Sequence, residues 1–153
     1  MLVLGAGAYK LMNSRTIQVA GELVARVDTT EKVVALTFDD GPTAGDTDAI
    51  LRTLAEHEVR ATFFVVGESV AADPESARTI MWDVAVEDYS GGPPQSAEEL
   101  VRLTVEGVRP GSVVLLHPWH GRTPTQAAIG PVIEELKGRG YRFVTVDELL
   151  ALR

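Results

Sequence analysis

Five short apolar segments alternate with stretches of helical length along this 153-residue chain, and this alternation is the strongest constraint on its fold. Two neighbouring parallel strands need a long crossover connection, which is usually a helix. The pattern therefore predicts an α/β fold with about five parallel strands, either as a doubly wound sheet or as a barrel. The expected strands are residues 33–38, 61–66, 80–86, 112–116 and 141–146, and the expected helices are 47–58, a segment starting at 73, 96–108, 126–137 and 147–152.

Polar side chains follow or lie near the ends of three of these strands. In parallel α/β folds, functional side chains gather at the carboxyl edge of the sheet, so three polar groups at that edge indicate a site. The groups are Asp39 with Asp40, Asp83 with Glu87 and Asp88, and His117 with His120.

The adjacent pair Asp39 and Asp40 is the most specific of these features. Two carboxylates at the end of a buried strand repel each other unless a cation or a proton lies between them. The pair therefore indicates a metal site or a general base. A local alternative is a turn in which the aspartates hydrogen-bond the backbone before Gly41-Pro42.

Composition narrows the classes of partner. The net charge of −8 disfavours nucleic acid and anionic membrane surfaces as partners. The chain has no cysteine, which excludes disulfides, thiolate metal sites and cysteine nucleophiles. The apolar residues 1–8 are too short to span a bilayer and carry no basic segment, so they are either the remnant of a signal or anchor or a frayed terminus.

Five sequence blocks together resemble the polysaccharide deacetylases (the NodB-homology domain, carbohydrate esterase family 4), from about Tyr9 onward. The blocks are VVALTFDDGPT, ATFFVVG, IMWDVAVEDY, PGSVVLLHPW and GYRFVTVDELL. The resemblance implies a shortened version of the family's (β/α) barrel over residues 31–153, preceded by an N-terminal segment at 1–30.

The resemblance also implies roles for individual residues. Asp39 matches the base that takes a proton from metal-bound water, and Asp40 matches a ligand of the divalent metal, zinc or similar. His117 matches the general acid that protonates the leaving amine. Asp83 matches an acidic residue that tunes the catalytic groups, and Leu115 matches the wall around the acetyl methyl group. A carboxylate and an imidazole managing protons beside a divalent ion make a consistent hydrolytic site.

The positions of several other polar and aromatic residues in the sequence indicate their roles. Trp119 follows a strand in a loop and is expected to stack on a sugar ring. Glu87 and Asp88 are interpreted as a solvated loop, and His57 as a solvated residue at the end of a helix.

The chain departs from the family in one region. The His-[Ser/Thr]-x-x-His pair that supplies two metal ligands is absent, and so is the Arg-Pro-Pro-aromatic segment. Both belong between Arg78 and Thr79, where the two flanks are joined directly. We therefore expect an internal deletion of two or three βα units, roughly 60–90 residues at about 30 per unit. The remaining metal site is expected to be weak, since zinc usually needs three protein ligands. A possible substitute is chelation by His117 and His120 together with Asp40.

Three functions are compatible with these residues. The first is hydrolysis of N-acetyl groups on glycans that contain N-acetylglucosamine, such as peptidoglycan or chitin. The second is a catalytically impaired relic that retains at most glycan or partner binding, and the missing histidines favour it for this polypeptide. The third, a signalling receiver domain, lacks a suitable phospho-acceptor aspartate and switch lysine at later strand ends.

The family resemblance further implies a cell-envelope or extracellular location, although the incomplete signal leaves the cytoplasm open. Loss of central units exposes strand edges, which invite association. We therefore expect a sheet that re-closes across the junction, an oligomer that covers the open edge, or a marginally stable chain.

Overall fold

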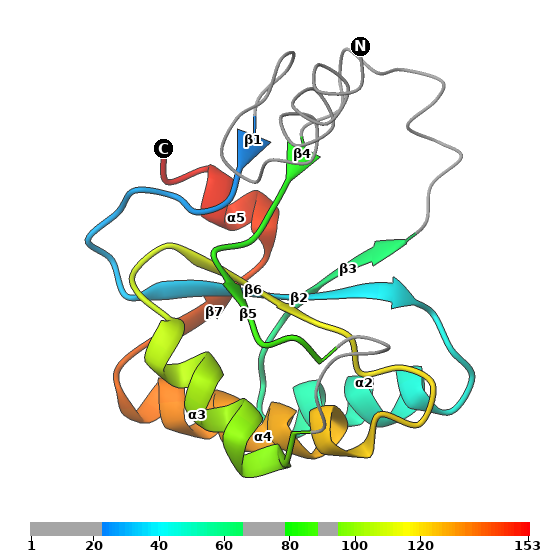
Figure 1. Cartoon of the computed structure of the whole chain (residues 1–153). Coiled ribbons are helices and arrows are strands. Elements are labelled where there is room, and N and C mark those ends of the chain that lie inside the picture. Colours follow the sequence, from blue (N-terminus) through cyan, green and yellow to red (C-terminus); the bar gives the residue numbers. More distant parts are fainter. Residues whose placement is uncertain (1–22, 66–78, 89–94) are drawn as a thin grey trace, which may run out of the picture.

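A nine-residue strand, β2 (Val33–Gly41), runs through the middle of the sheet and organises the fold (Figure 1). The structure is a computed structural model, and it describes residues 23–65, 79–88 and 95–153. The first six residues of β2 are buried, as expected for a strand covered on both faces. The other elements are β1 (Leu23–Val24), α2 (Asp46–Glu56), β3 (Thr62–Val65), β4 (Thr79–Ile80), β5 (Val84–Ala85), α3 (Ala97–Gly107), β6 (Ser112–Leu116), α4 (Thr123–Gly138), β7 (Arg142–Val144) and α5 (Val146–Leu150).

The main sheet is parallel, in the order β3-β2-β6-β5, and β7 pairs with the first residues of β2. β7 pairs with β2 from Val33 to Ala35, whereas β3 pairs with β2 from Thr37 onward. β1 and β4 form a separate two-stranded parallel sheet. The prediction of an α/β fold with about five parallel strands is confirmed.

Helices cover one face of the main sheet, and a smaller cluster covers the other (Figure 1). On the first face, α2, α3 and α4 pack against alternate residues of β2 and β6. On the second face, α5 and β1 pack against the intervening residues. The first cluster includes Leu36, Phe38, Leu116, Ile50 and Ile129, and the second includes Val33, Ala35, Val113 and Leu149.

The single strand predicted over residues 80–86 is wrong. The structure has two short strands there, β4 and β5, with Asp83 between them. The carboxylate of Asp83 is bonded to the beginning of β6, so the chain enters the main sheet only after that residue. The helix predicted from residue 73 and the segment 1–22 lie outside the described residues.

Over the described residues, the main sheet is open. Of its strands, β3 precedes the predicted junction and β5 follows it after β4, and these two occupy opposite ends of the strand order and do not pair. Re-closure of the sheet between these two strands is therefore wrong for the described part of the chain. Within the described ranges, no helix combines the length and the apolar character needed to cross a bilayer.

Two buried threonines allow a matched test of the core. Thr104 on α3 is fully buried, and its hydroxyl has no hydrogen-bond partner among the described residues. Thr37 is equally buried, but its hydroxyl donates to the carbonyl oxygen of Val114 at 2.8 Å. We expect Thr104→Val to raise the free energy of unfolding by about 1 kcal/mol, because it removes an unpaired buried hydroxyl.

The same substitution at Thr37 should lower the free energy of unfolding by about 1 kcal/mol, because it breaks a bond across the two central strands. Urea unfolding of both variants measures the two effects. Equal destabilisation by both substitutions would contradict the assignment of an unpaired hydroxyl to Thr104.

Candidate active site

The two central strands bring the predicted base and the predicted acid to the same edge of the sheet. Phe38 on β2 pairs with Leu116 on β6 in parallel register. Asp39 is the next residue of β2, which continues to Gly41, and His117 directly follows β6, so both lie toward the carboxyl edge of the sheet. The negative charges of Asp39 and Asp40 both act on the imidazole of His117, which agrees with this placement.

β2 is irregular between Phe38 and Gly41, where its register with β3 shifts, and we call this irregular stretch, residues 39–41, the aspartate turn. The backbone N–H of Asp40 donates to Oδ1 of Asp39 at 2.9 Å, and Asp40 adopts a left-handed conformation with φ of 67°. Asparagine and aspartate tolerate this conformation better than other side chains do. The local turn interpretation is therefore correct in part, and it is compatible with a chemical role for the two carboxylates.

Trp119 lies in the core beneath this turn, so its prediction as a sugar-stacking platform is wrong. Only 2% of the residue is exposed. Its indole N–H donates to the carbonyl oxygen of Asp39, and its ring centroid lies 6.3 Å from that of Phe63. A Cβ atom on Gly41 would lie 2.4 Å from Cζ2 of the indole, so only glycine leaves room for the ring.

His117 is held by Asp88. The backbone N–H of His117 donates to Oδ2 of Asp88 at 2.8 Å, and Nδ1 of the imidazole lies 3.0 Å from Oδ1. The Asp88 side chain is only 2% exposed, so the interpretation of Asp88 as a solvated loop residue is wrong. Glu87 beside it is exposed, as expected.

The contact with Asp88 shifts the pKa of the His117 imidazole. The hydrogen bond with Asp88 raises the pKa of His117 above its ordinary value, and partial burial opposes this effect. The negative charges of Asp88, Asp40 and Asp39 raise the pKa further. The site therefore favours imidazolium, which is the form that a general acid requires.

Asp83 lies at the wrong end of the sheet for the role predicted from the sequence. Its Oδ1 accepts from the backbone N–H of Val113, and its Oδ2 accepts from the hydroxyl of Ser112, both at 3.0 Å. Arg109 donates to the same Oδ2 at 3.3 Å. These partners belong to the amino end of β6, whereas His117 follows its carboxyl end. Asp83 therefore fixes β5 against β6 instead of meeting the catalytic groups.

Asp88 is the acidic residue that the sequence analysis missed. Its position after β5, near the carboxyl edge that carries Asp39 and His117, was the available signal. Leu115 pairs with Thr37 and Ala85 in the neighbouring strands and is 2% exposed. Its role beside the acetyl methyl group stays a prediction.

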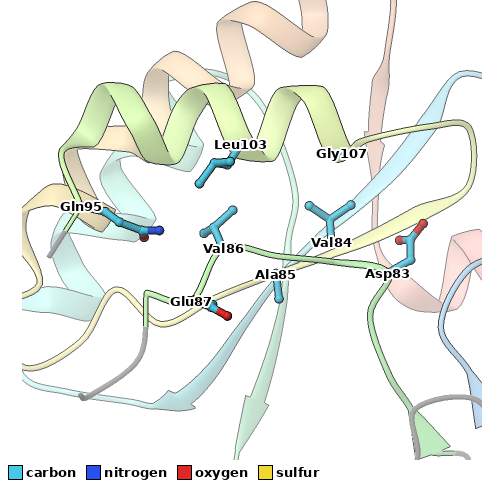
Figure 2. A pocket seen from close by; sticks show the side chains of 8 residues that line it. All are labelled: Asp83, Val84, Ala85, Val86, Glu87, Gln95, Leu103 and Gly107. Carbon is cyan, nitrogen blue, oxygen red and sulfur yellow. The ribbon is translucent and has the colours of Figure 1, made fainter. Parts of the chain in front are cut away.

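A hollow of about 330 Å³ lies between the β5 segment and α3 (Figure 2). Figure 2 shows Val84 and Val86 pointing toward α3, with Asp83 at one end of the hollow and Gln95 at the other. Its lining residues include neither the aspartates of the β2 turn nor His117, so it is separate from the candidate active site.

The described residues do not fit a metal ion. No three histidine, cysteine, aspartate or glutamate side chains within the described ranges gather closely enough to hold one. The expected chelation by Asp40, His117 and His120 is therefore not formed. His120 is exposed in a left-handed turn, and His57 lies at the end of α2 near Gly130 of α4.

Comparison with known proteins shows to which family the chain belongs. The sequence model for polysaccharide deacetylase matches residues 26–90. The peptidoglycan-N-acetylglucosamine deacetylase PgdA of Listeria monocytogenes is 30% identical over 184 residues, covering 78% of this chain and 39% of that protein. The chain belongs to the polysaccharide deacetylase family. The resemblance noted from the five sequence blocks is thereby confirmed.

Two further relatives extend the comparison. A peptidoglycan-N-acetylglucosamine deacetylase of Bacillus cereus is 24% identical over 206 residues, covering 89% of this chain and 96% of that protein. A family 4 acetyl xylan esterase from Clostridium thermocellum, solved in complex with a cobalt ion, has a TM-score of 0.63 and 26% identity. That match covers 79% of this chain and 91% of the esterase. Relatives within the family thus act on glycans, and at least one binds a metal ion.

The relatives differ from this chain in length. The chain spans 39% of the length of the Listeria deacetylase. The two sequence alignments extend over 184 and 206 residues, more than the 153 residues of this chain, so each relative has residues without a counterpart here. The internal deletion expected between Arg78 and Thr79, like its location, stays a prediction.

Replacing Asp88 with asparagine should flatten the pH dependence of the free energy of unfolding. The raised pKa of His117 means that the protonated imidazole stabilises the fold fully below the unfolded value of about 6.5. That stabilisation is lost as the pH rises through the folded pKa. The Asp88→Asn substitution removes the main cause of the shift, so urea unfolding at stepped pH should show a smaller slope.

His120→Gln provides the control for this measurement, because His120 is exposed and should leave the slope unchanged. An Asp88→Asn variant with the wild-type slope would contradict the assignment of Asp88 as the main cause of the raised pKa of His117.

Asp83→Ala should lower the free energy of unfolding by about 2–3 kcal/mol, because Ser112 and Val113 would lose their shared acceptor. The neighbouring variant Glu87→Ala should change stability by less than about 0.5 kcal/mol, since Glu87 is exposed. Thermal and urea unfolding measure both. Wild-type stability of Asp83→Ala would argue against its role in joining β5 to β6.

Proposed function

We propose that this chain hydrolyses N-acetyl groups on glycans that contain N-acetylglucosamine, such as peptidoglycan or chitin-like polymers. The observation that carries the proposal is the Asp88–His117 pair after the end of β6, toward the same sheet edge as Asp39 of β2. A carboxylate and a protonated imidazole at one sheet edge are the two groups that amide hydrolysis needs for its proton transfers.

The proposed reaction adds one water molecule to the amide bond. The carboxylate of Asp39 accepts a proton as water attacks the carbonyl carbon. The imidazolium of His117 donates a proton to the departing nitrogen as the C–N bond breaks. The products are acetate and a free amine on the sugar. Asp88 stays ionised and holds the ring of His117 throughout, as an orienting carboxylate does in other acid–base pairs.

Hydrolysis of an amide also requires polarisation of its carbonyl group. A bound divalent ion would normally supply that function, but the described residues provide no three-ligand site for one. No step is therefore assigned to a metal. We expect turnover to depend on the acid–base pair and to be slow compared with a metal-loaded hydrolase.

A second candidate is a glycan-binding domain with impaired catalysis. The specific observation in its favour is the same lack of three gathered metal ligands within the described ranges. In this case the sheet edge with Asp39 and His117 would bind an acetylated glycan without releasing acetate.

The cellular setting follows from the proposed substrate. Peptidoglycan or a similar polymer lies in the cell envelope, so we propose that location for the chain. The proposed domain covers residues 31–153, with 1–30 as a preceding segment. The open edges at β3 and β5 are the proposed surfaces for self-association.

Acetate release from N-acetylated chito-oligosaccharides and from acetylated peptidoglycan tests the proposal. We expect Asp39→Asn and His117→Gln each to reduce the rate by about 10²–10⁴, the usual contribution of a positioned acid or base. His57→Gln is the matched control, because His57 lies outside the site and should keep the wild-type rate.

Metal content should be measured in the same preparations. We expect less than one equivalent of zinc per chain and no loss of stability on chelation, since the described residues lack a three-ligand set. No acetate release by the wild type, together with retained glycan binding, would favour the second candidate. Stoichiometric zinc would contradict the absence of a three-ligand metal site among the described residues.

A further inference from the structure

Trp119 contacts the aspartate turn at two points. Its indole N–H donates to the carbonyl oxygen of Asp39. On the other side of Asp40, its ring lies directly against the α-carbon of Gly41, where an added Cβ would lie 2.4 Å from Cζ2, 2.8 Å from Cε2 and 2.9 Å from Cη2. The two contacts fall on either side of Asp40, the residue in the left-handed conformation.

These contacts restrict the segment that carries both carboxylates. A turn on a protein surface ordinarily samples several backbone conformations, because little packs against it. Here the bond to the Asp39 carbonyl fixes the residue before Asp40, and the ring limits the position of the residue after it. The conformation of Asp40 is therefore determined from outside the turn as well as by the local bond to Asp39.

The segment that carries Trp119 is itself anchored. The backbone N–H of His117 donates to Asp88, and the carbonyl oxygen of Pro118 accepts a hydrogen bond from the Gln126 side chain at 2.8 Å. The same Gln126 nitrogen donates to Asp46 at the start of α2, also at 2.8 Å. Residues 117–119 are thus fixed at consecutive positions, and the indole is a rigid extension of that fixed segment.

We propose that Trp119 is a positioning residue that sets the Asp39–Asp40 turn relative to His117. Trp119 lies two residues after the acid and bonds the backbone of the base, so it links the two catalytic groups through a short rigid connection. This inference rests on the proposed hydrolysis as far as rate is concerned. Its geometric content, that the indole orders the turn, stands independently of turnover.

Trp119→Phe tests the proposal, because it keeps an aromatic ring in the core and removes the indole N–H. We expect kcat to fall by about 10- to 100-fold with little change in KM, as for a small misplacement of a catalytic group. A sugar-stacking residue would give the opposite pattern, with a raised KM and an unchanged kcat.

Amide hydrogen exchange gives a readout that needs no activity. In the wild type we expect the Asp40 amide to be protected, because it is bonded to Asp39 in an ordered turn. In Trp119→Phe that amide should exchange about two- to tenfold faster, the factor expected for loss of one hydrogen bond. The Leu36 amide, within β2, should keep its protection in both proteins. Gly41→Ala should loosen the turn in the same way, because its Cβ displaces the ring.

Phe63→Leu is the matched control. Phe63 packs in the same aromatic group, 5.2 Å from Phe38 and 6.3 Å from Trp119 between ring centroids. It should lower stability while leaving both kcat and the exchange of the Asp40 amide at wild-type values. This pattern separates positioning of the turn from general loss of core packing.

Each outcome bears on the proposal. Faster exchange at Asp40 in Trp119→Phe but not in Phe63→Leu supports it, even if the wild type releases no acetate and the proposed function fails. Unchanged exchange at Asp40 in Trp119→Phe overturns it. An active wild type whose Trp119→Phe variant keeps kcat and raises KM also overturns it, and leaves the proposed function intact.

Discussion

The parallel pairing of β2 with β6 is the interaction on which the candidate site depends. Five consecutive pairs join the two strands, from Val34 with Ser112 to Phe38 with Leu116. The hydroxyl of Thr37 adds a side-chain bond to the carbonyl oxygen of Val114. Both strands are buried over this length, so the register is strongly specified. A shortened domain can keep Asp39 beside His117 because both rest on this central pair.

Asp88 is positioned by a shorter strand than Asp39 and His117 are. It follows β5, a two-residue strand at the end of the sheet. β5 pairs with β6 at Val84 and Ala85, and the bonds from Asp83 to the amino end of β6 fix the residue just before β5. The bonds of Asp88 to His117 fix the other end of the same segment. Asp83 therefore helps to position the segment that leads to Asp88, although it touches no catalytic group.

Structural features that depend on local sequence pattern were predicted correctly. Features that depend on a tertiary contact were not. Apolar runs and their spacing predicted the parallel sheet, and the strand-end rule predicted the common edge for Asp39 and His117. The run IMWDVAV gave no sign that its strand begins only after Asp83, because the interruption is caused by bonds to Ser112 and Val113. A strand that starts a few residues later moves one aspartate to the far edge and brings another to the site.

The prediction that Trp119 stacks on a sugar ring failed for a related reason. The burial of Trp119 depends on the space that Gly41 leaves on a different strand. Neither residue alone predicts the contact. The sequence contains both, but the pairing of β2 with β6 is what places them together.

The raised pKa of His117 bears on the two roles that the sequence allowed it, acid or metal ligand. A ligand must present a ring lone pair, and an imidazolium has none, because both nitrogens carry protons. Asp88 raises the pKa of His117, and Asp40 and Asp39 raise it further, so the surrounding carboxylates favour the form that cannot coordinate a cation. The raised pKa of His117 suits the imidazole to the role of general acid, and Asp88 is the main cause of that shift.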